Sequence, residues 1–173
     1  MSISTSTTLN NVDLATVGGL VGAIQDQPAV AATTWSAEVK WKGGFRSEAR
    51  IREFAPVPSD EPAALGGADT APNPVEQLLG ALGNCLAVGY AANASVAGIA
   101  IRDLRIELTG DLDLRAFLGL REGHAGFDDI RVVVHLDADA SEDQLRELHD
   151  KVVGSSPVGH TLGRAVPVTI DLA

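Results

Sequence analysis

The stretch that most constrains the fold is an apolar helix predicted from Pro74 to about Val96. Its start is marked three times: Asn73 is a favourable N-cap, Pro74 suits the first helical position, and Glu76 can return a hydrogen bond to the cap. Gly98 is expected to end the helix. Because the helix is apolar on most of its sides, other elements have to cover it. The chain is therefore expected to fold around this helix.

Shorter elements are expected on both sides of the central helix. One helix is predicted over residues 11–27, an amphipathic helix begins at a capping box of Ser141 and Gln144, and a short helix covers Ser156–Gly163. Alternating apolar residues and hairpin glycines predict strands at Thr33–Lys42, Phe45–Phe54, Ile101–Thr109, Gly126–Leu136 and Val166–Leu172, with a long irregular loop at Ala55–Pro72. This order of elements predicts an α+β fold in which antiparallel sheets wrap the buried central helix.

The size and charge of the chain exclude several classes of protein. Its 173 residues suit one domain, and we expect a single domain over residues 1–173. A formal net charge of -10 argues against nucleic acid or an anionic membrane as a partner, since both need clustered Lys and Arg. We expect neither a signal peptide nor a membrane-spanning helix, because the chain lacks a basic start and any apolar run of about 18 residues. A reducing cytoplasm is the expected location, where a single thiol stays free.

Cys85 is the one cysteine of the sequence, so an intrachain disulfide is excluded. It lies about 13 Å along the helix from Glu76 and on the opposite side, so the two side chains cannot pair within the helix. A single buried cysteine is commonly a small hydrophobic residue. A reactive thiol needs a cationic neighbour or the N-terminus of another helix. Ser156, as the N-cap before Pro157, begins a helix that can supply such a terminus and a hydroxyl donor.

The other chemistry-bearing residues each allow two interpretations. Glu76 either caps the central helix or belongs to an active site. Arg46 and Arg50 share one face of the predicted strand Phe45–Phe54, and they form either a cationic cluster at a site or a solvated strand face. His160 follows the Ser-Pro-Val segment closely, with surface placement as its alternative. No Cys and His spacing suits zinc, so we expect neither a metal nor a cofactor.

Two segments together resemble the OsmC/Ohr family. Pro72–Cys85 reads PNPVEQLLGALGNC and follows the family pattern N-P-x-E-x-L-L-x-A-x-x-x-C, which opens a buried central helix. Ser156–Leu162 reads SPVGHTL and matches the family segment C-P-V-x-x-T/V-L, except that serine stands at the cysteine. The resemblance covers the chain from Trp35 to the C-terminus in element order. It leaves residues 1–30 as an added N-terminal helical extension.

The resemblance implies an OsmC-like fold and an intertwined homodimer with two active sites at its interface. It implies that Cys85 is the peroxidatic cysteine and that Ser156 stands where a resolving cysteine would form a disulfide. The peroxidase branch has its active-site Glu directly after Asn-Pro, where this chain has Val75, and an Arg shortly before Asn-Pro, where this chain has none. An arginine of the Phe45–Phe54 strand, such as Arg46 or Arg50 of either subunit, would have to replace it.

These observations support two main functional hypotheses. One is a thiol-based redox protein of oxidative stress, a one-cysteine organic hydroperoxide reductase that uses Cys85 and an external thiol reductant. The alternative is a non-catalytic protein that binds a small hydrophobic ligand in the dimer-interface cleft, with an unreactive Cys85. A structural or stress-related dimer with neither activity is the third reading.

Overall fold

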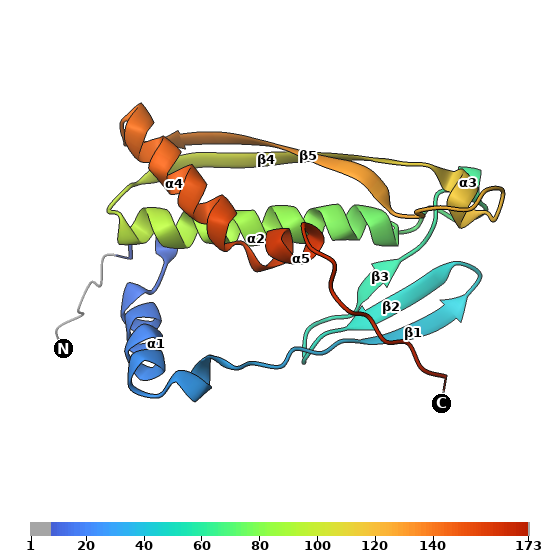
Figure 1. Cartoon of the computed structure of the whole chain (residues 1–173), viewed down its shortest axis with the longest axis horizontal. Coiled ribbons are helices and arrows are strands. Elements are labelled where there is room, and N and C mark those ends of the chain that lie inside the picture. The colour runs from blue at the N-terminus through green and yellow to red at the C-terminus, as the bar shows by residue number, and fades with distance from the viewer. Residues whose placement is uncertain (1–7, 173) are drawn as a thin grey trace. The chain divides into compact units, whose positions relative to one another are not determined.

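The computed structural model describes residues 8–172 and divides into two compact units. The larger unit comprises the chain up to Leu14 together with Leu79–Ala173, and the smaller unit comprises Ala15–Leu78. The helices are α1 (Leu14–Asp26), α2 (Pro74–Val96), α3 (Leu114–Phe117), α4 (Glu142–Ser155) and α5 (Pro157–Leu162). The strands are β1 (Glu38–Gly43), β2 (Arg46–Arg50), β3 (Val57–Ser59), β4 (Ile101–Leu112) and β5 (Phe127–Ala138) (Figure 1). Short 3-10 turns lie at Leu9–Asn11, Pro28–Ala31 and Ala63–Leu65.

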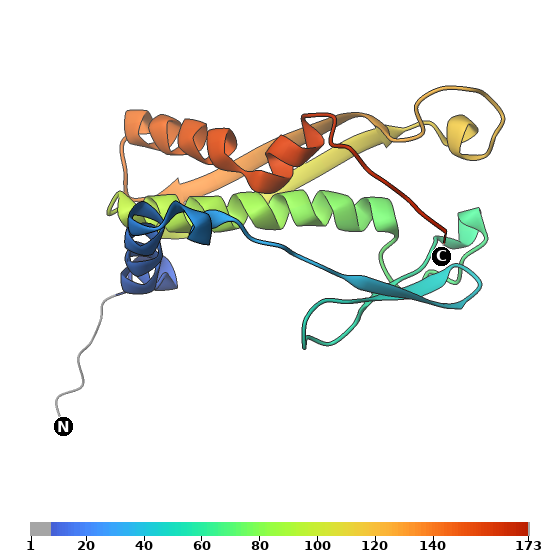
Figure 2. The same cartoon turned by 60° about the horizontal axis from the view of Figure 1, so that its bottom comes forward.

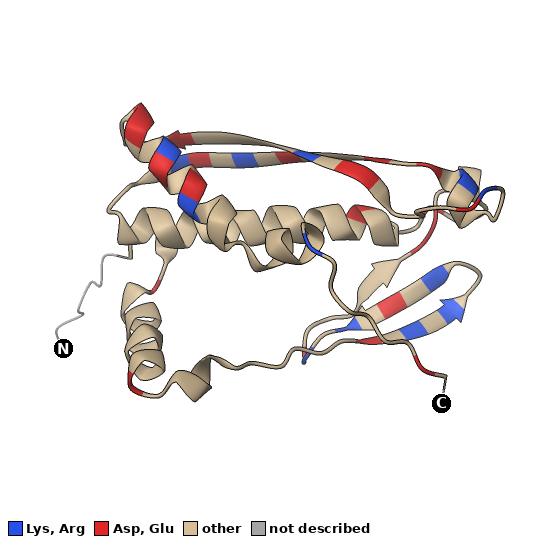
Figure 3. Ribbon diagram, in the orientation of Figure 1, with Lys and Arg blue, Asp and Glu red and all other residues tan. Residues whose placement is uncertain are grey.

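The sheet of the larger unit is a long antiparallel hairpin of β4 and β5. Inward residues pair across it, as Leu104 does with Leu136, and they alternate with outward residues along each strand. The outward face carries ion pairs such as that between Arg131 and Asp111 at 2.8 Å. Figure 3 shows these charges along the hairpin and on α4, whereas α2 is almost bare of them. The hairpin therefore presents one apolar face for packing.

One stripe of α2 is buried against the inner face of the hairpin. Figures 1 and 2 show α2 lying along the hairpin, with α4 and α5 beside it. The stripe repeats every four residues, as residues on one side of a helix do, and Leu148 and Val152 of α4 join it in the same hydrophobic core. Its members are Leu82, Leu86, Tyr90 and Ala94. Val88, on another side of α2, stays exposed, so a single chain covers this helix on one side.

Helices α2 and α4 approach each other closely at Gly89. A Cβ atom added there would lie 2.9 Å from Cγ1 of Val152, well inside the usual separation of about 3.5–4.0 Å between carbon atoms. Val152 is only 1% exposed. The absence of a side chain at residue 89 therefore lets the valine of α4 reach the surface of α2.

A short N-terminal segment holds the corner between α2 and β4. The Nδ2 of Asn10 donates hydrogen bonds to the Oγ of Ser95 and the carbonyl of Ile99, both at 3.0 Å. The Oδ1 of Asn10 accepts a hydrogen bond from the N–H of Ile101 at 2.9 Å. Asn10 has a φ of 53°, in the left-handed region that asparagine tolerates better than most residues. One side chain thus bonds both the end of the helix and the start of the strand.

The smaller unit contains a three-stranded antiparallel sheet in the order β1-β2-β3. Residues directly opposite each other share a face, so Val39, Ala49 and Val57 line an apolar face, while charged residues such as Glu38 and Arg50 line the other. The apolar face is open: Trp41 on it is 75% exposed. Among its described residues, this unit buries no hydrophobic side chain; the two residues it buries are polar, Asp60 and Asn73.

Asp60 fastens the loop that leads from β3 toward α2. Its carboxylate accepts hydrogen bonds from the hydroxyl and N–H of Thr70, at 2.7 and 3.2 Å, and from the N–H of Glu61 at 2.8 Å. The Thr70 hydroxyl is the main reason that the pKa of the Asp60 carboxyl lies below its usual value, with the backbone N–H groups adding to it. The loop is therefore closed by its own polar groups.

Most of the predicted elements are confirmed. Helix α2 has its predicted bounds, α1 falls within residues 11–27, and the capping box of Ser141 and Gln144 is formed. The short helix after Ser156 is present as α5, and the antiparallel hairpins are formed. The single domain over 1–173 and the helical extension over 1–30 stay predictions, and the first seven residues of that extension lie outside the described part of the chain.

Four predicted segments differ from the structure. The strand predicted at Thr33–Lys42 begins only at Glu38, and that at Phe45–Phe54 ends at Arg50, where a turn with the N–H of Phe54 bonded to the carbonyl of Ile51 follows. The loop predicted at Ala55–Pro72 contains β3, because its backbone pairs with β2. Within the described residues Val166–Leu172 forms no strand: it alternates as a strand does, but no neighbouring strand pairs with it.

Every helix in the described part of the chain is too short or too polar to span a lipid bilayer.

The packing of α4 on α2 predicts different costs for two adjacent valines. Val152→Ala removes two buried methyl groups and should lower the free energy of unfolding by about 2 kcal/mol. Val153→Ala is the matched control, because Val153 is 52% exposed, and its effect should stay within about 0.5 kcal/mol. Urea unfolding followed by circular dichroism measures both. Equal unfolding midpoints for the two variants would contradict this packing.

Candidate functional site

The structure brings together Cys85 and Ser156, which are 71 residues apart in the sequence. The Sγ of Cys85 lies 3.3 Å from the Oγ of Ser156. Cys85 is half-buried and precedes Leu86 of the buried stripe, and Ser156 lies between α4 and α5. Because α4 packs against the same stripe, its C-terminal end is held beside the cysteine.

Ser156 is placed to donate a hydrogen bond to the sulfur. It is 5% exposed and is the N-cap of α5, where its Oγ accepts a hydrogen bond from the N–H of Gly159 at 3.1 Å. A hydroxyl accepts through its lone pairs and keeps its single proton for another partner. When Cys85 is a thiolate, the Ser156 hydroxyl is the donor of their contact. The serine can therefore stabilise an anion on sulfur, but it cannot form a disulfide.

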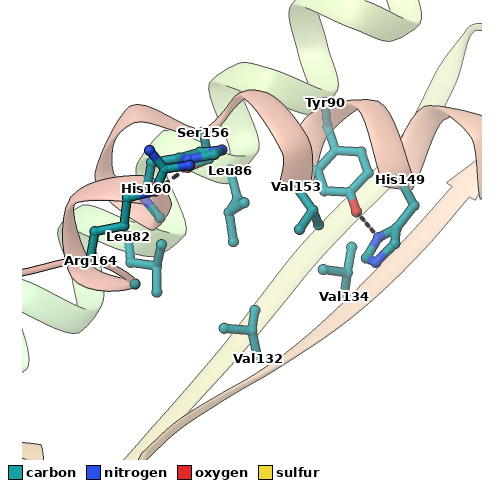
Figure 4. A pocket seen from close by; sticks show the side chains of 12 residues that line it. Leu82, Leu86, Tyr90, Val132, Val134, His149, Val153, Ser156, His160 and Arg164 are labelled. Carbon is teal, nitrogen blue, oxygen red and sulfur yellow. Dashed lines mark hydrogen bonds between the residues drawn. The ribbon is translucent and has the colours of Figure 1, made fainter.

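A cavity of about 470 Å³ within the larger unit reaches Ser156 (Figure 4). Its walls are mainly apolar and come from three elements. They are Leu82 and Leu86 of α2, Val132 and Val134 of β5, and Val153 of α4. The volume falls in the range of about 300–1,000 Å³ that is usual for small-molecule sites. An apolar space of ligand size thus borders the partner of Cys85.

Tyr90 and His149 form a hydrogen-bonded pair at one end of the cavity. The Tyr90 hydroxyl lies 2.5 Å from Nδ1 of His149, and Figure 4 shows the two side chains turned toward each other. Burial raises the pKa of the Tyr90 phenol above its usual value, so the phenol keeps its proton at neutral pH and can donate it to the imidazole. The two groups satisfy each other.

His160 and Arg164 line the cavity on the side of Ser156 (Figure 4). With its Nε2 protonated, His160 donates a hydrogen bond to the carbonyl of Gly154 at 2.9 Å. Arg164 comes directly after Gly163, where α5 ends. Within the described residues, no ion pair or hydrogen bond involves the Arg164 side chain. The side of the cavity near Ser156 therefore includes a free positive charge.

Glu76 caps the start of α2, as one of its two predicted roles requires. Its carboxylate accepts a hydrogen bond from the N–H of Asn73 at 2.8 Å, and its own N–H donates to the Oδ1 of Asn73 at 2.9 Å. The reciprocal bonds form a capping box. The capping role is confirmed, and an active-site role for Glu76 stays a prediction.

Arg46 and Arg50 lie on the charged face of β2, together with Glu48. Glu48 itself pairs with Lys42 at 3.0 Å. Both arginines belong to the smaller unit, and Cys85 belongs to the larger one. A role for either arginine beside the cysteine stays a prediction.

The described part of the chain contains no group of three His, Cys, Asp or Glu side chains that could hold a metal ion. Three of the four histidines have other partners: His135 contacts Glu107, His149 contacts Tyr90 and His160 contacts the carbonyl of Gly154. The groups that the structure brings together at the site are a thiol and a hydroxyl.

Sequence reasoning missed three residues that line the cavity: Tyr90, His149 and Arg164. A signal was present for two of them, because Leu82, Leu86 and Tyr90 share one side of the predicted helix, and His149 is followed at helical spacing by Val153 and Ser156. Arg164 had no such signal, since it follows the end of α5.

Comparison with known proteins assigns the segments that contain Cys85 and Ser156 to one family. Residues 66–171 match the family described as OsmC-like protein, and this range includes the whole Pro72–Cys85 motif and the Ser156–Leu162 segment. The match confirms the predicted resemblance. A search of curated proteins finds no match.

Structural comparison supports the same fold. An OsmC-like protein from Mycoplasma pneumoniae is 20% identical and has a TM-score of 0.66, with 76% of this chain and 88% of that chain covered. An organic hydroperoxide resistance protein OsmC from Legionella pneumophila, also described as a predicted redox protein, is 17% identical with a TM-score of 0.56 and coverage of 76% and 91%. An organic hydroperoxide resistance protein from Elizabethkingia anophelis is 16% identical with a TM-score of 0.55 and coverage of 74% and 88%. The predicted α+β, OsmC-like fold is confirmed.

The contact between Cys85 and Ser156 predicts that a cysteine at residue 156 can form a disulfide. In Ser156→Cys, hydroperoxide should produce an intrachain disulfide, because the present Sγ to Oγ distance of 3.3 Å leaves only a small side-chain movement to a sulfur–sulfur bond of about 2.05 Å. Mass spectrometry without reductant measures the loss of two hydrogen atoms. Ser155→Cys is the matched control, because the Ser155 hydroxyl bonds instead to the carbonyl of Lys151. Two free thiols in oxidised Ser156→Cys would contradict the prediction.

Proposed function

Because the chain belongs to the OsmC-like protein family, we propose that it is a thiol-based redox protein, a one-cysteine organic hydroperoxide reductase that uses Cys85. The observation that carries this proposal is the 3.3 Å contact between Cys85 and a serine hydroxyl that is already bound to a backbone N–H. That geometry suits a sulfur that becomes an anion. The structural neighbours described as organic hydroperoxide resistance proteins support the same class of substrate.

The proposed reaction has two steps. The Cys85 thiolate attacks the outer oxygen of a hydroperoxide, the O–O bond breaks, and the alkoxide takes up a proton and leaves as an alcohol. Cys85 is then a sulfenic acid. A first external thiol forms a mixed disulfide with it and releases water, and a second thiol releases the Cys85 thiol and leaves an external disulfide. The hydroperoxide gains two electrons, and the two external thiols supply them.

The external reductant is needed because Ser156 cannot resolve the sulfenic acid. In this proposal the serine donates a hydrogen bond to the thiolate and then to the sulfenate oxygen or sulfur, and so acts as a positioning residue for the sulfur. A reducing compartment such as the cytoplasm supplies thiols in excess and suits a protein with one cysteine. Arg46 or Arg50 of either subunit is the candidate for a cation near Cys85. Glu76 cannot reach Cys85 along its own helix, and an active-site role for it stays a prediction.

A homodimer is the second part of the proposal. The apolar face of the β1-β2-β3 sheet is open, with Trp41 and Val39 largely exposed, and the β4–β5 hairpin has unpaired backbone along both edges within the described residues. Val166–Leu172 alternates like a strand without a partner. In an isolated chain the apolar sheet face and the backbone groups of the strand edges are exposed to water. A second copy of the chain can cover this face and pair with these edges.

The alternative function is ligand binding without catalysis, and the 470 Å³ cavity favours it. The resemblance to the family places the ligand in a dimer-interface cleft, whereas this cavity is built from one unit of one chain. Under this alternative Cys85 is unreactive, and a thiol reagent should label it no faster than a free cysteine. Faster labelling favours the redox protein.

The redox proposal predicts consumption of an organic hydroperoxide that depends on Cys85. With cumene hydroperoxide and dithiothreitol or dihydrolipoamide, wild-type protein should turn over, and Cys85→Ser should fall to the rate without protein. Ser156→Ala should lower the rate by about ten- to a hundredfold, because a hydrogen bond to a charged group is worth about 1.5–3 kcal/mol. Ser155→Ala is its matched control. Wild-type turnover no faster than that of Cys85→Ser would refute the reductase and leave the binding function.

The dimer proposal predicts the mass in solution. Light scattering should give twice the chain mass of 17.9 kDa. Trp41→Glu places a charge on the apolar sheet face and should shift the mass toward one chain. Lys40→Glu, on the opposite face of the same strand, should leave the dimer intact. A wild-type protein with the mass of one chain at micromolar concentration would contradict the proposal.

A further inference from the structure

Within the described residues, one polar side chain that lines the cavity in the larger unit has no partner. Tyr90 is bonded to His149, Ser156 to the N–H of Gly159, and His160 to the carbonyl of Gly154. Arg164 lines the same cavity, and within the described residues its guanidinium makes no ion pair or hydrogen bond. The cavity thus leaves one polar group, a cation, to be satisfied from outside the chain.

The free state of Arg164 sets it apart from the other arginines of its unit. Each of the six others pairs with a carboxylate, at Asp or Glu, within the described residues. They are Arg102, Arg105, Arg115, Arg121, Arg131 and Arg146. The chain has a net charge of -10, so carboxylates are abundant. An arginine without a carboxylate at the edge of a cavity is therefore a place where an anion from solution can bind.

The remainder of the cavity suits an apolar body. Leu82, Leu86, Val132, Val134 and Val153 form its walls, and at the end opposite Arg164 in Figure 4 the Tyr90–His149 pair is already satisfied. At that end, among the described residues, no polar group of the lining is left without a hydrogen-bond partner, so the ligand needs no second charged group there. A ligand that fits has one charged end and an otherwise apolar structure.

We propose that this cavity binds a monocarboxylate with a compact apolar body, aryl or branched alkyl, whose carboxylate pairs with Arg164. The two oxygens of a carboxylate match the two parallel N–H donors of a guanidinium. A phosphate monoester carries more charge than one arginine neutralises, and the cavity lining offers no second free cation. The proposal goes beyond the reductase function and does not depend on any reaction of Cys85.

Calorimetry with 4-phenylbutyrate and its neutral amide, 4-phenylbutyramide, tests the proposal on the wild-type protein. The carboxylate should bind about tenfold more tightly than the amide, because a charge-assisted pair with arginine is lost in the amide. Absence of 4-phenylbutyrate binding at millimolar concentration, equal binding of acid and amide, or tighter binding of phenyl phosphate would overturn the proposal. Binding is read as heat without any hydroperoxide, so its failure and a failure of the reductase function are separate results.

Three variants locate the site. Arg164→Gln should weaken 4-phenylbutyrate about tenfold and leave the amide unchanged, and Arg146→Gln is the control with the same loss of charge on an arginine that lies outside the cavity lining. Val153→Trp, at a half-exposed position on α4, should fill the cavity and abolish binding of both compounds while circular dichroism stays unchanged. Equal effects of Arg164→Gln and Arg146→Gln, or unchanged binding in a folded Val153→Trp, would overturn the proposal.

Discussion

The rest of the larger unit depends on the burial of one stripe of α2 against the β4–β5 hairpin. Each large apolar side chain that leaves water there contributes about 1.5–3 kcal/mol, and the stripe supplies several of them within four helical turns. Helix α4 packs on the same stripe through Leu148 and Val152. The stripe therefore fixes the position of α4 against α2, and with it the place where α5 begins.

This arrangement explains why a thiol and a hydroxyl meet. Cys85 lies at the edge of the stripe, half-buried, and Ser156 is the residue at which α4 gives way to α5. Pro157 interrupts the helix there, which frees the Ser156 hydroxyl to cap α5. The polar contact is thus a product of apolar packing on one side and a break in the helix on the other.

Local signals predicted α2 and its cap well, since Asn73, Pro74 and Glu76 act on each other within one turn. Helix-start signals indicate that Ser156 can supply a hydroxyl and a helix terminus to a thiol, but only the resemblance places it beside Cys85, because the two residues are far apart in the chain. Helical spacing places Tyr90 and His149 on the packed sides of their helices, but only tertiary packing brings the two side chains together. Arg164 has no local signal, because it follows the end of α5. The strand expected at Val166–Leu172 failed for a related reason: alternation describes which face a residue takes, whereas a strand also needs a neighbouring backbone.

Asn10 connects the start of the described chain to the corner between α2 and β4. Its three hydrogen bonds reach both sides of the α2–β4 corner, so the described residues before α1 belong to the same compact unit as the cavity. This short segment is therefore part of the packing of the larger unit. A shortened chain that lacks Asn10 would leave the N–H of Ile101 and the carbonyl of Ile99 to find water, and the hairpin would lose the anchor of its first strand.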